Sequence, residues 1–145
     1  MDKKIKLIWI KRILLIKVII TFLAWGLPAL LGPKWFLGLF SLSMPEDPMY
    51  LRLFGAVVTA FGVAYWFAYR EPIQNRAIIQ AGIVDNGLIT LAIIYLALTS
   101  GIESWFISIS GLLTGLFCIS FIVFMPSREF QYNGTLLKKQ KSETL

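Results

Sequence analysis

Residues 77–100 are the part of the sequence that most restricts how this chain can fold. They read AIIQAGIVDNGLITLAIIYLALTS, which is apolar enough to cross a bilayer and yet contains Asp85 and Asn86. A membrane helix needs about 20 mostly apolar residues, and a carboxylate inside one costs roughly 2.5–3.5 kcal/mol unless it is paired, neutralised or hydrated. We therefore expect the rest of the chain to provide a polar interior around Asp85.

The composition indicates a membrane protein. Of the 145 residues, 57% are hydrophobic, which is more apolar surface than one small soluble core could bury. The excess of basic residues, 14 against 8 acidic, would suggest nucleic acid in a soluble chain. Here the charges lie at the ends of apolar runs, which is the membrane pattern and argues against nucleic acid as a partner.

Several kinds of chemistry lack the residues they require. The chain has no histidine, and its one cysteine, Cys118, allows neither an internal disulfide nor a dithiol pair. The usual ligands of haem, zinc and copper are therefore missing, and we predict neither a metal site nor a cofactor. No nucleophile and base pair or phosphate-binding loop can be assembled either, so the sequence gives no support for an enzyme.

The apolar runs predict an all-α integral membrane protein, a four-helix bundle with up-down-up-down topology. Its spans are expected at about residues 13–31, 51–69, 77–99 and 105–125, within a membrane domain of residues 13–126. Pro28 predicts a kink in the first span. Residues 33–50 are too short and too rich in proline to span, yet too apolar for a free loop, so we expect an interfacial or re-entrant segment. Residues 1–12 form a basic cytoplasmic or interfacial segment, and residues 127–145 a polar cytoplasmic tail.

The basic residues also predict the orientation. If both termini lie on one side, that side holds twelve of them and the other side holds only Lys34 and Arg52. Lysine and arginine concentrate on the cytoplasmic side of membrane proteins. We therefore expect a multi-pass protein with both termini in the cytoplasm.

Four polar residues are candidates for a ligand or proton site: Lys17, Arg52, Asp85 and Asn86. Asp85 is either a structural carboxylate or a functional one, and the sequence leaves both readings open. Lys17 and Thr21 lie on one face of the first span, which we expect to point inward, so that Lys17 pairs with Asp85.

Arg52 either points into the protein or anchors its helix at the interface, with Glu46, Asp47 or Glu103 as its partner. The Asp-Asn-Gly sequence at 85–87 predicts a local break or wide turn in its helix. Tyr65, Trp66 and Tyr69 are typical of an aromatic belt at the membrane interface.

Small residues on single helix faces predict close helix packing. They form a stripe with Arg52 on the second span, accompany Asp85 on the third, and have G-x-x-x-G spacing on the fourth. The positions are Gly55, Thr59, Gly62, Gly82, Gly111 and Gly115.

The arrangement of four spans resembles that of the small DoxX-like membrane proteins. The resemblance rests on a first loop with an apolar dip and a proline, on RLFGA at 52–56, and on a glycine-containing helix ending in YREP at 69–72. It implies a compact four-helix bundle in a prokaryotic cytoplasmic (inner) membrane. Some members of that family are associated with quinone-linked redox complexes.

Two functions follow from these expectations. The first is a non-catalytic accessory or assembly subunit that packs against other membrane subunits or against a second copy of itself. The alternative is a binding protein or proton-coupled transporter for a lipophilic or cationic small molecule, which uses Asp85. A quinone or another lipophilic compound is the candidate ligand.

Overall fold

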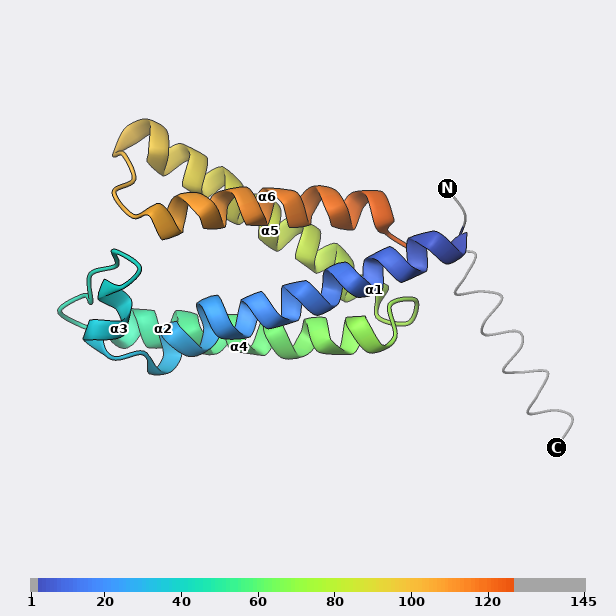
Figure 1. The fold of residues 1–145 in the computed structure, drawn as a ribbon, viewed down its shortest axis with the longest axis horizontal. Helices are drawn as coiled ribbons and strands as arrows, with labels where there is room; N and C mark the ends of the chain where they lie inside the picture. Colours follow the sequence, from blue (N-terminus) through green and yellow to red (C-terminus); the bar gives the residue numbers. More distant parts are fainter. Residues whose placement is uncertain (1–2, 127–145) are drawn as a thin grey trace, which may run out of the picture.

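The computed structural model describes residues 3–126, and within them every regular element is a helix (Figure 1). The elements are α1 (Lys3–Ile20), a π-helical segment η1 (Thr21–Gly26), α2 (Leu27–Leu31), α3 (Lys34–Gly38), α4 (Met49–Arg70), α5 (Arg76–Thr99) and α6 (Trp105–Phe124). In this part of the chain, four helices are long and apolar enough to cross a membrane. The all-α class and the four candidate spans are thus confirmed. The predicted tail at 127–145 lies outside the described residues.

The first long helix begins earlier than the apolar run suggested. It starts at Lys3 and continues as α1, η1 and α2 to Leu31, so most of the basic segment is helical. Ile10, within that segment, has no exposed surface and belongs to the core. Ile10 and the partly buried Leu7 therefore pack against the core, whereas Ile5 and Ile8 are exposed.

The expected disturbance at Pro28 takes the form of the π-helical segment that precedes it. Proline has no N–H to donate to the carbonyl four residues earlier, and its ring crowds that carbonyl. The backbone adjusts over one wider turn, in which the N–H of Leu27 donates to the carbonyl of Phe22, five residues earlier. Such π segments inside α-helices are frequent at functional sites.

The predicted break at residues 85–87 is wrong, because α5 is continuous from Arg76 to Thr99. Asp-Asn-Gly forms turns in water because its side chains compete for backbone groups. Here the amide of Asn86 donates to the carbonyl of Gly82, one helical turn back, at 2.6 Å. The side chain thus bonds along the helix without interrupting it.

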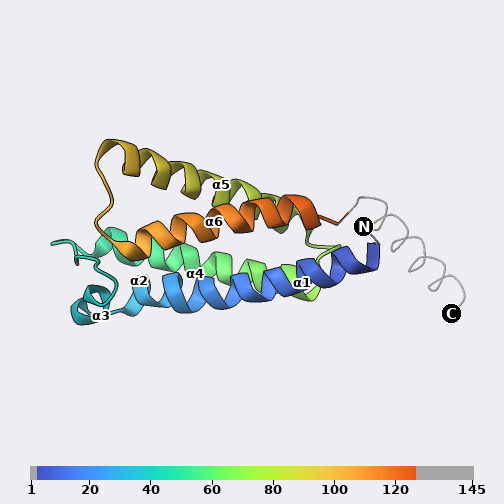
Figure 2. The ribbon, with the colours of Figure 1, turned by 45° about the horizontal axis from the view of Figure 1, so that its top comes forward.

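The long helices form two pairs. α4 packs along α1, η1 and α2, and α5 packs along α6, whereas α4 and α5 touch each other much less (Figures 1 and 2). The two pairs meet near the N-terminus and the α4–α5 turn. We call this end the closed half, and its core comprises Ile10, Leu14, Val18, Tyr65, Ala68, Ile79 and Phe121.

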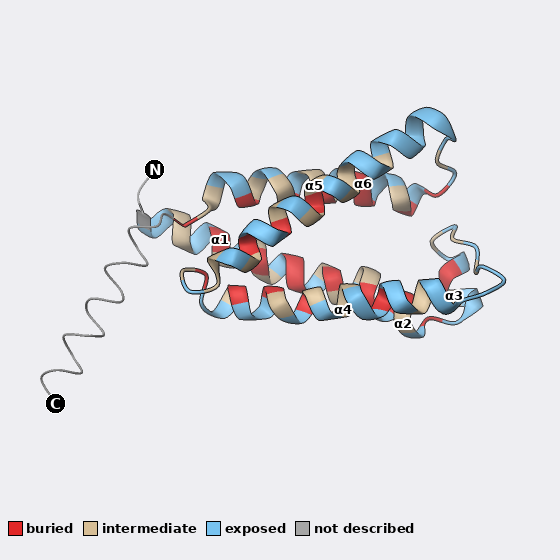
Figure 3. Cartoon of the chain, turned by 180° about the vertical axis from the view of Figure 1, so that it is seen from behind, coloured by how far each residue is buried: buried red, intermediate tan, exposed pale blue. Residues whose placement is uncertain are grey.

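Toward the other end the two pairs separate, and we call this part the open half. The far end is bridged by aromatic rings, with Phe106 centred 4.8 Å from both Trp25 and Phe40. Ser104 also donates to the carbonyl of Phe40 at 2.8 Å. Much of α5 is exposed in this half (Figure 3).

Candidate functional site

Four polar side chains from three helices meet where the closed half borders the open half. Lys17 from α1 donates to the amide oxygen of Asn86 at 2.6 Å, and Tyr65 from α4 donates to the Asp85 carboxylate at 3.1 Å. The amide nitrogen of Asn86 is 3.4 Å from the hydroxyl of Tyr65, which links the two bonds. Lys17, Tyr65, Asp85 and Asn86 therefore form one network, which we call the polar cluster.

Lys17 is nearly buried, with 7% of its surface exposed. Its ammonium lies 4.8 Å from the ring centre of Phe117 and 5.5 Å from that of Tyr65. Aromatic faces attract cations, and more strongly when water is excluded. The aromatic rings and the Asn86 oxygen together stabilise an ammonium that would otherwise be costly to bury.

The sequence correctly placed Lys17 near the third span but predicted the wrong partner. The amine donates to Asn86, and the hydrogen bond that Asp85 accepts comes from Tyr65. Adjacent residues on a helix point about 100° apart, so only one of the two can face α1 directly. Asn86 does so with no exposed surface, while Asp85 is turned toward a cavity.

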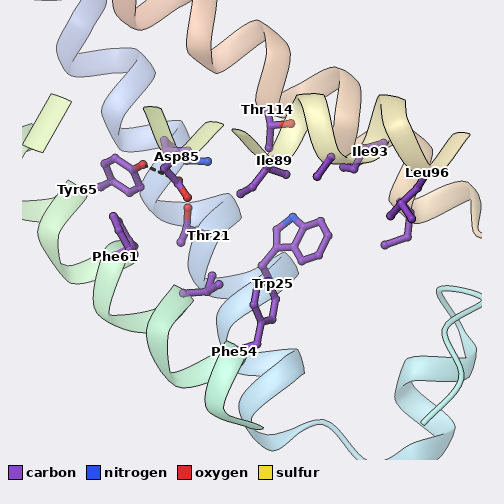
Figure 4. A pocket seen from close by; sticks show the side chains of 14 residues that line it. Thr21, Trp25, Phe54, Phe61, Tyr65, Asp85, Ile89, Ile93, Leu96 and Thr114 are labelled. Carbon is purple, nitrogen blue, oxygen red and sulfur yellow. Dashed lines mark hydrogen bonds between the residues drawn. The ribbon is translucent and has the colours of Figure 1, made fainter. Parts of the chain in front are cut away.

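This cavity, of about 270 Å³, lies between the two helix pairs in the open half (Figure 4). The polar cluster is at one end, and aromatic and aliphatic side chains form the walls. The lining residues are Lys17, Thr21, Trp25, Phe54, Val58, Phe61, Tyr65, Asp85, Ile89, Ala92, Ile93, Leu96, Ile107 and Thr114. A mostly apolar cavity with a few polar groups at one end is typical of a small-molecule site.

The cavity opens sideways between α4 and α5. Two of its lining residues there, Phe54 and Leu96, are 44% and 46% exposed. The contacts between these helices are also sparse compared with those between α5 and α6. In a bilayer this opening would face lipid, so an apolar molecule could enter without crossing water.

The Thr21 hydroxyl has no hydrogen-bond partner within the described part of the chain, although only 5% of the residue is exposed. The four other threonines in the described helices each donate to the carbonyl four residues earlier. Thr21 is also the first residue of the π-helical segment. A buried hydroxyl without a partner costs about 1–3 kcal/mol.

Arg52 lies elsewhere, and the expected carboxylate partners are wrong. Its guanidinium donates to the carbonyls of Ala29 at 3.1 Å and Gly32 at 2.9 Å. These carbonyls end α2, where no further turn supplies donors, so Arg52 caps that helix. Asp47 instead accepts from the backbone N–H of Met49 at 2.8 Å, at the start of α4.

The small residues proposed for packing lie between helices. A Cβ on Gly55 would meet the backbone of Leu30, and one on Gly26 would lie 2.7 Å from the Thr59 hydroxyl. The corresponding neighbours are Phe22 for Gly62, Tyr65 and Phe121 for Gly82, Ile93 for Gly111 and Thr90 for Gly115. The first three positions of the set, Gly55, Thr59 and Gly62, hold α4 against η1 and α2.

Tyr65 is the main site residue that the sequence interpretation missed. It is 1% exposed and belongs to the core, so its assignment to an aromatic belt is wrong. A signal was present, because Phe54, Val58, Phe61 and Tyr65 recur at helical spacing on one face of α4. That face is the α4 wall of the cavity.

No metal centre can be assembled from the part of the chain that is described, since no group of three or more His, Cys, Asp or Glu side chains comes together there. Cys118 donates to the carbonyl of Ile83 at 3.4 Å, which is a packing contact between α6 and α5. No protein-family model matches this sequence, and no curated protein or solved structure is significantly similar to it.

Proposed function

We propose that this chain is a membrane protein that binds a lipophilic small molecule in the cavity of the open half. The observation that carries the proposal is the combination of an apolar cavity, a sideways opening between α4 and α5, and the carboxylate of Asp85 at the inner end. A carboxylate at this depth is costly, and a ligand site is the common reason for retaining one. The same site could serve binding alone or proton-coupled transport.

The proposal includes a topology and a location. The four spans form an up-down-up-down bundle in a prokaryotic cytoplasmic membrane, with both termini in the cytoplasm, as the charge distribution and the DoxX-like pattern suggest. Reporter fusions test the orientation. A carboxy-terminal reporter should be active in the cytoplasm, and periplasmic activity would contradict the charge argument.

The binding function is tested by isolating the protein from its native membrane in polymer nanodiscs and analysing the bound small molecules by mass spectrometry. Ala92 lines the cavity and Ala81, on the same helix, is exposed and does not. We expect a small molecule to accompany the original chain and Ala81→Trp, but not Ala92→Trp. Equal recovery from the two tryptophan variants, or no small molecule with the original chain, would contradict the proposal.

A second candidate function is that of an accessory subunit. It is favoured by α5, because only 11% of the apolar window of this helix is buried, the smallest share of the four. Such a face contacts either lipid or another membrane protein. The same isolation distinguishes the two, since a stoichiometric second protein in the nanodiscs supports the subunit and its absence counts against it.

A further inference from the structure

Two polar groups that face each other across the inner end of the cavity are not fully bonded. The hydroxyl of Thr21, on the first helix, points toward the carboxylate of Asp85 on α5 (Figure 4). Thr21 has no partner within residues 3–126, and Tyr65 bonds one carboxylate oxygen of Asp85, leaving the other. A group placed between them could accept from Thr21 and donate to Asp85.

The other polar side chains at this end already have protein partners. Lys17 is held by Asn86, and Thr114 is bonded to the carbonyl of Ser110 at 3.0 Å and to Thr90 at 2.9 Å. The pair of Thr21 and Asp85 is therefore where a ligand can gain hydrogen bonds that the protein does not make itself. Thr21 is also the residue at which the π-helical segment starts.

The ionisable side chains that line the cavity determine which ligand charge is favourable there. Among the described residues that line the cavity, Lys17, Asp85 and Tyr65 are the ionisable ones. The charges of Lys17 and Asp85 sum to zero whether the proton is on the amine or on the carboxylate. An ionised ligand would add an unbalanced charge to a site surrounded by apolar side chains and lipid, which is unfavourable. A neutral ligand leaves the net charge of the site at zero.

We propose that the ligand is a neutral lipophile with a hydroxyl head, a phenol or an alcohol, whose oxygen accepts from Thr21 and whose hydrogen is donated to Asp85. This inference rests on the proposed binding function and names its substrate class. The cavity of about 270 Å³ is larger than the roughly 150 Å³ cavity known to hold benzene, so it accommodates a ring with part of a chain. The remainder of the chain extends between α4 and α5 into the bilayer.

The test uses tritiated 4-hexylphenol and the full-length protein in nanodiscs of phosphatidylcholine, with empty nanodiscs as background. Competitors are unlabelled 4-hexylphenol, 4-hexylanisole, which lacks the donor, and 4-hexylbenzylamine, which is a cation at neutral pH. We expect the phenol to compete about tenfold better than the anisole, since one hydrogen bond to a carboxylate is lost. The amine should also compete more weakly than the phenol.

Variants locate the hydrogen bonds. Thr21→Val removes the hydroxyl with little change of shape. It should weaken binding of the phenol and of the anisole by a similar factor of several-fold, because the oxygen of either compound can accept from Thr21. The matched control is Thr99→Val, because Thr99 is exposed at the end of α5 and bonds only to the carbonyl of Tyr95 and to Ser100. It should bind all three compounds as the original chain does.

The outcomes separate this inference from the proposed function. Saturable binding with equal affinity for phenol and anisole, unaffected by Thr21→Val, would overturn hydroxyl recognition and leave the binding function standing. Preference for the amine would overturn the neutral class in favour of a cation. Absence of saturable binding by all three compounds would overturn the proposed ligand class, and the small molecules recovered from native nanodiscs then decide the binding function.

Discussion

The two halves of the molecule use the same four helices in opposite ways. In the closed half, all four meet, and side chains such as Ile10, Ala68 and Phe121 have no exposed surface. In the open half, α4 and α5 separate, and the side chains between them line a cavity. The difference predicts that the closed half contributes most of the stability of the fold, and that substitutions in the open half cost less.

The polar cluster lies at the border and depends on both halves. The closed half supplies the aromatic faces of Tyr65 and Phe117 beside Lys17, so the ammonium is held without a direct carboxylate partner. Asp85 is thereby left with one oxygen toward the open half. A charge that would be destabilising alone is thus positioned by the closed half and presented to the cavity.

The largest expected difference in the free energy of unfolding is between two variants that each lose an aromatic ring, one in each half. Phe121→Ala should lower the free energy of unfolding by about 2–4 kcal/mol, because the closely packed neighbours of Phe121 cannot fill the space. Phe54→Ala should cost about 1 kcal/mol or less, because Phe54 is 44% exposed and borders the cavity. Denaturant unfolding in mixed micelles measures both. Equal losses would show that the two halves are packed alike.

The next effect concerns the amide that holds Lys17. Asn86→Leu removes the hydrogen bonds to Lys17, Tyr65 and Gly82 and leaves a buried amine without an acceptor, at an expected cost of about 2–3 kcal/mol. Gln80→Leu is the control, since Gln80 is exposed on the same helix and should tolerate the change. The same unfolding measurement applies. A negligible loss for Asn86→Leu would mean that the polar cluster does not stabilise the border.

Two glycines of α5 are compared next, and the expected effects of their substitution on stability are smaller. A Cβ on Gly82 would lie 2.9 Å from the rings of Tyr65 and Phe121, so Gly82→Ala should destabilise by about 1–2 kcal/mol. A Cβ on Gly87 would meet only the Cys118 sulfur, at 3.6 Å, and Gly87→Ala should be neutral or slightly stabilising because alanine favours helix. If thermal melting shows the reverse order, α5 is packed differently from the structure.

The smallest effect is predicted for Thr21. Thr21→Val removes an unbonded hydroxyl, so stability should stay the same or rise slightly. Thr90→Val removes a hydroxyl bonded to the Asn86 carbonyl and to Thr114, and should cost about 1 kcal/mol. Thermal melting monitored by circular dichroism compares the two. A clear loss for Thr21→Val would show that its hydroxyl is already bonded in the protein.

The sequence predicted the features that depend on local pattern. The length of the apolar runs gave four helices, and the spacing of Lys17 and Thr21 placed both on a face that is buried in the structure. The partner of Lys17 could not be predicted in this way. It depends on the rotation of α5 about its axis, which decides between the neighbours Asp85 and Asn86.

The wrong predictions for Tyr65 and Arg52 also arise from tertiary packing. An aromatic residue near a helix end reads as an interfacial anchor, but Tyr65 is buried because α1, α5 and α6 converge on it. Arg52 is close in the sequence to Glu46 and Asp47, yet its guanidinium donates to carbonyls at the end of α2. The residues that flank Tyr65 and Arg52 in the sequence indicate neither the packing of the helices around Tyr65 nor the position of the end of α2.

The central claim is that the open half holds a space that a lipophile can fill, and two tryptophan variants test it most directly. Binding of tritiated 4-hexylphenol and the melting temperature are measured together for Ala92→Trp, in the cavity wall, and Ala68→Trp, in the closed half. We predict that Ala92→Trp melts within a few degrees of the original chain and loses at least tenfold in binding, whereas Ala68→Trp loses its fold. An Ala92→Trp variant that is folded and binds the phenol as well as the original chain would contradict the account.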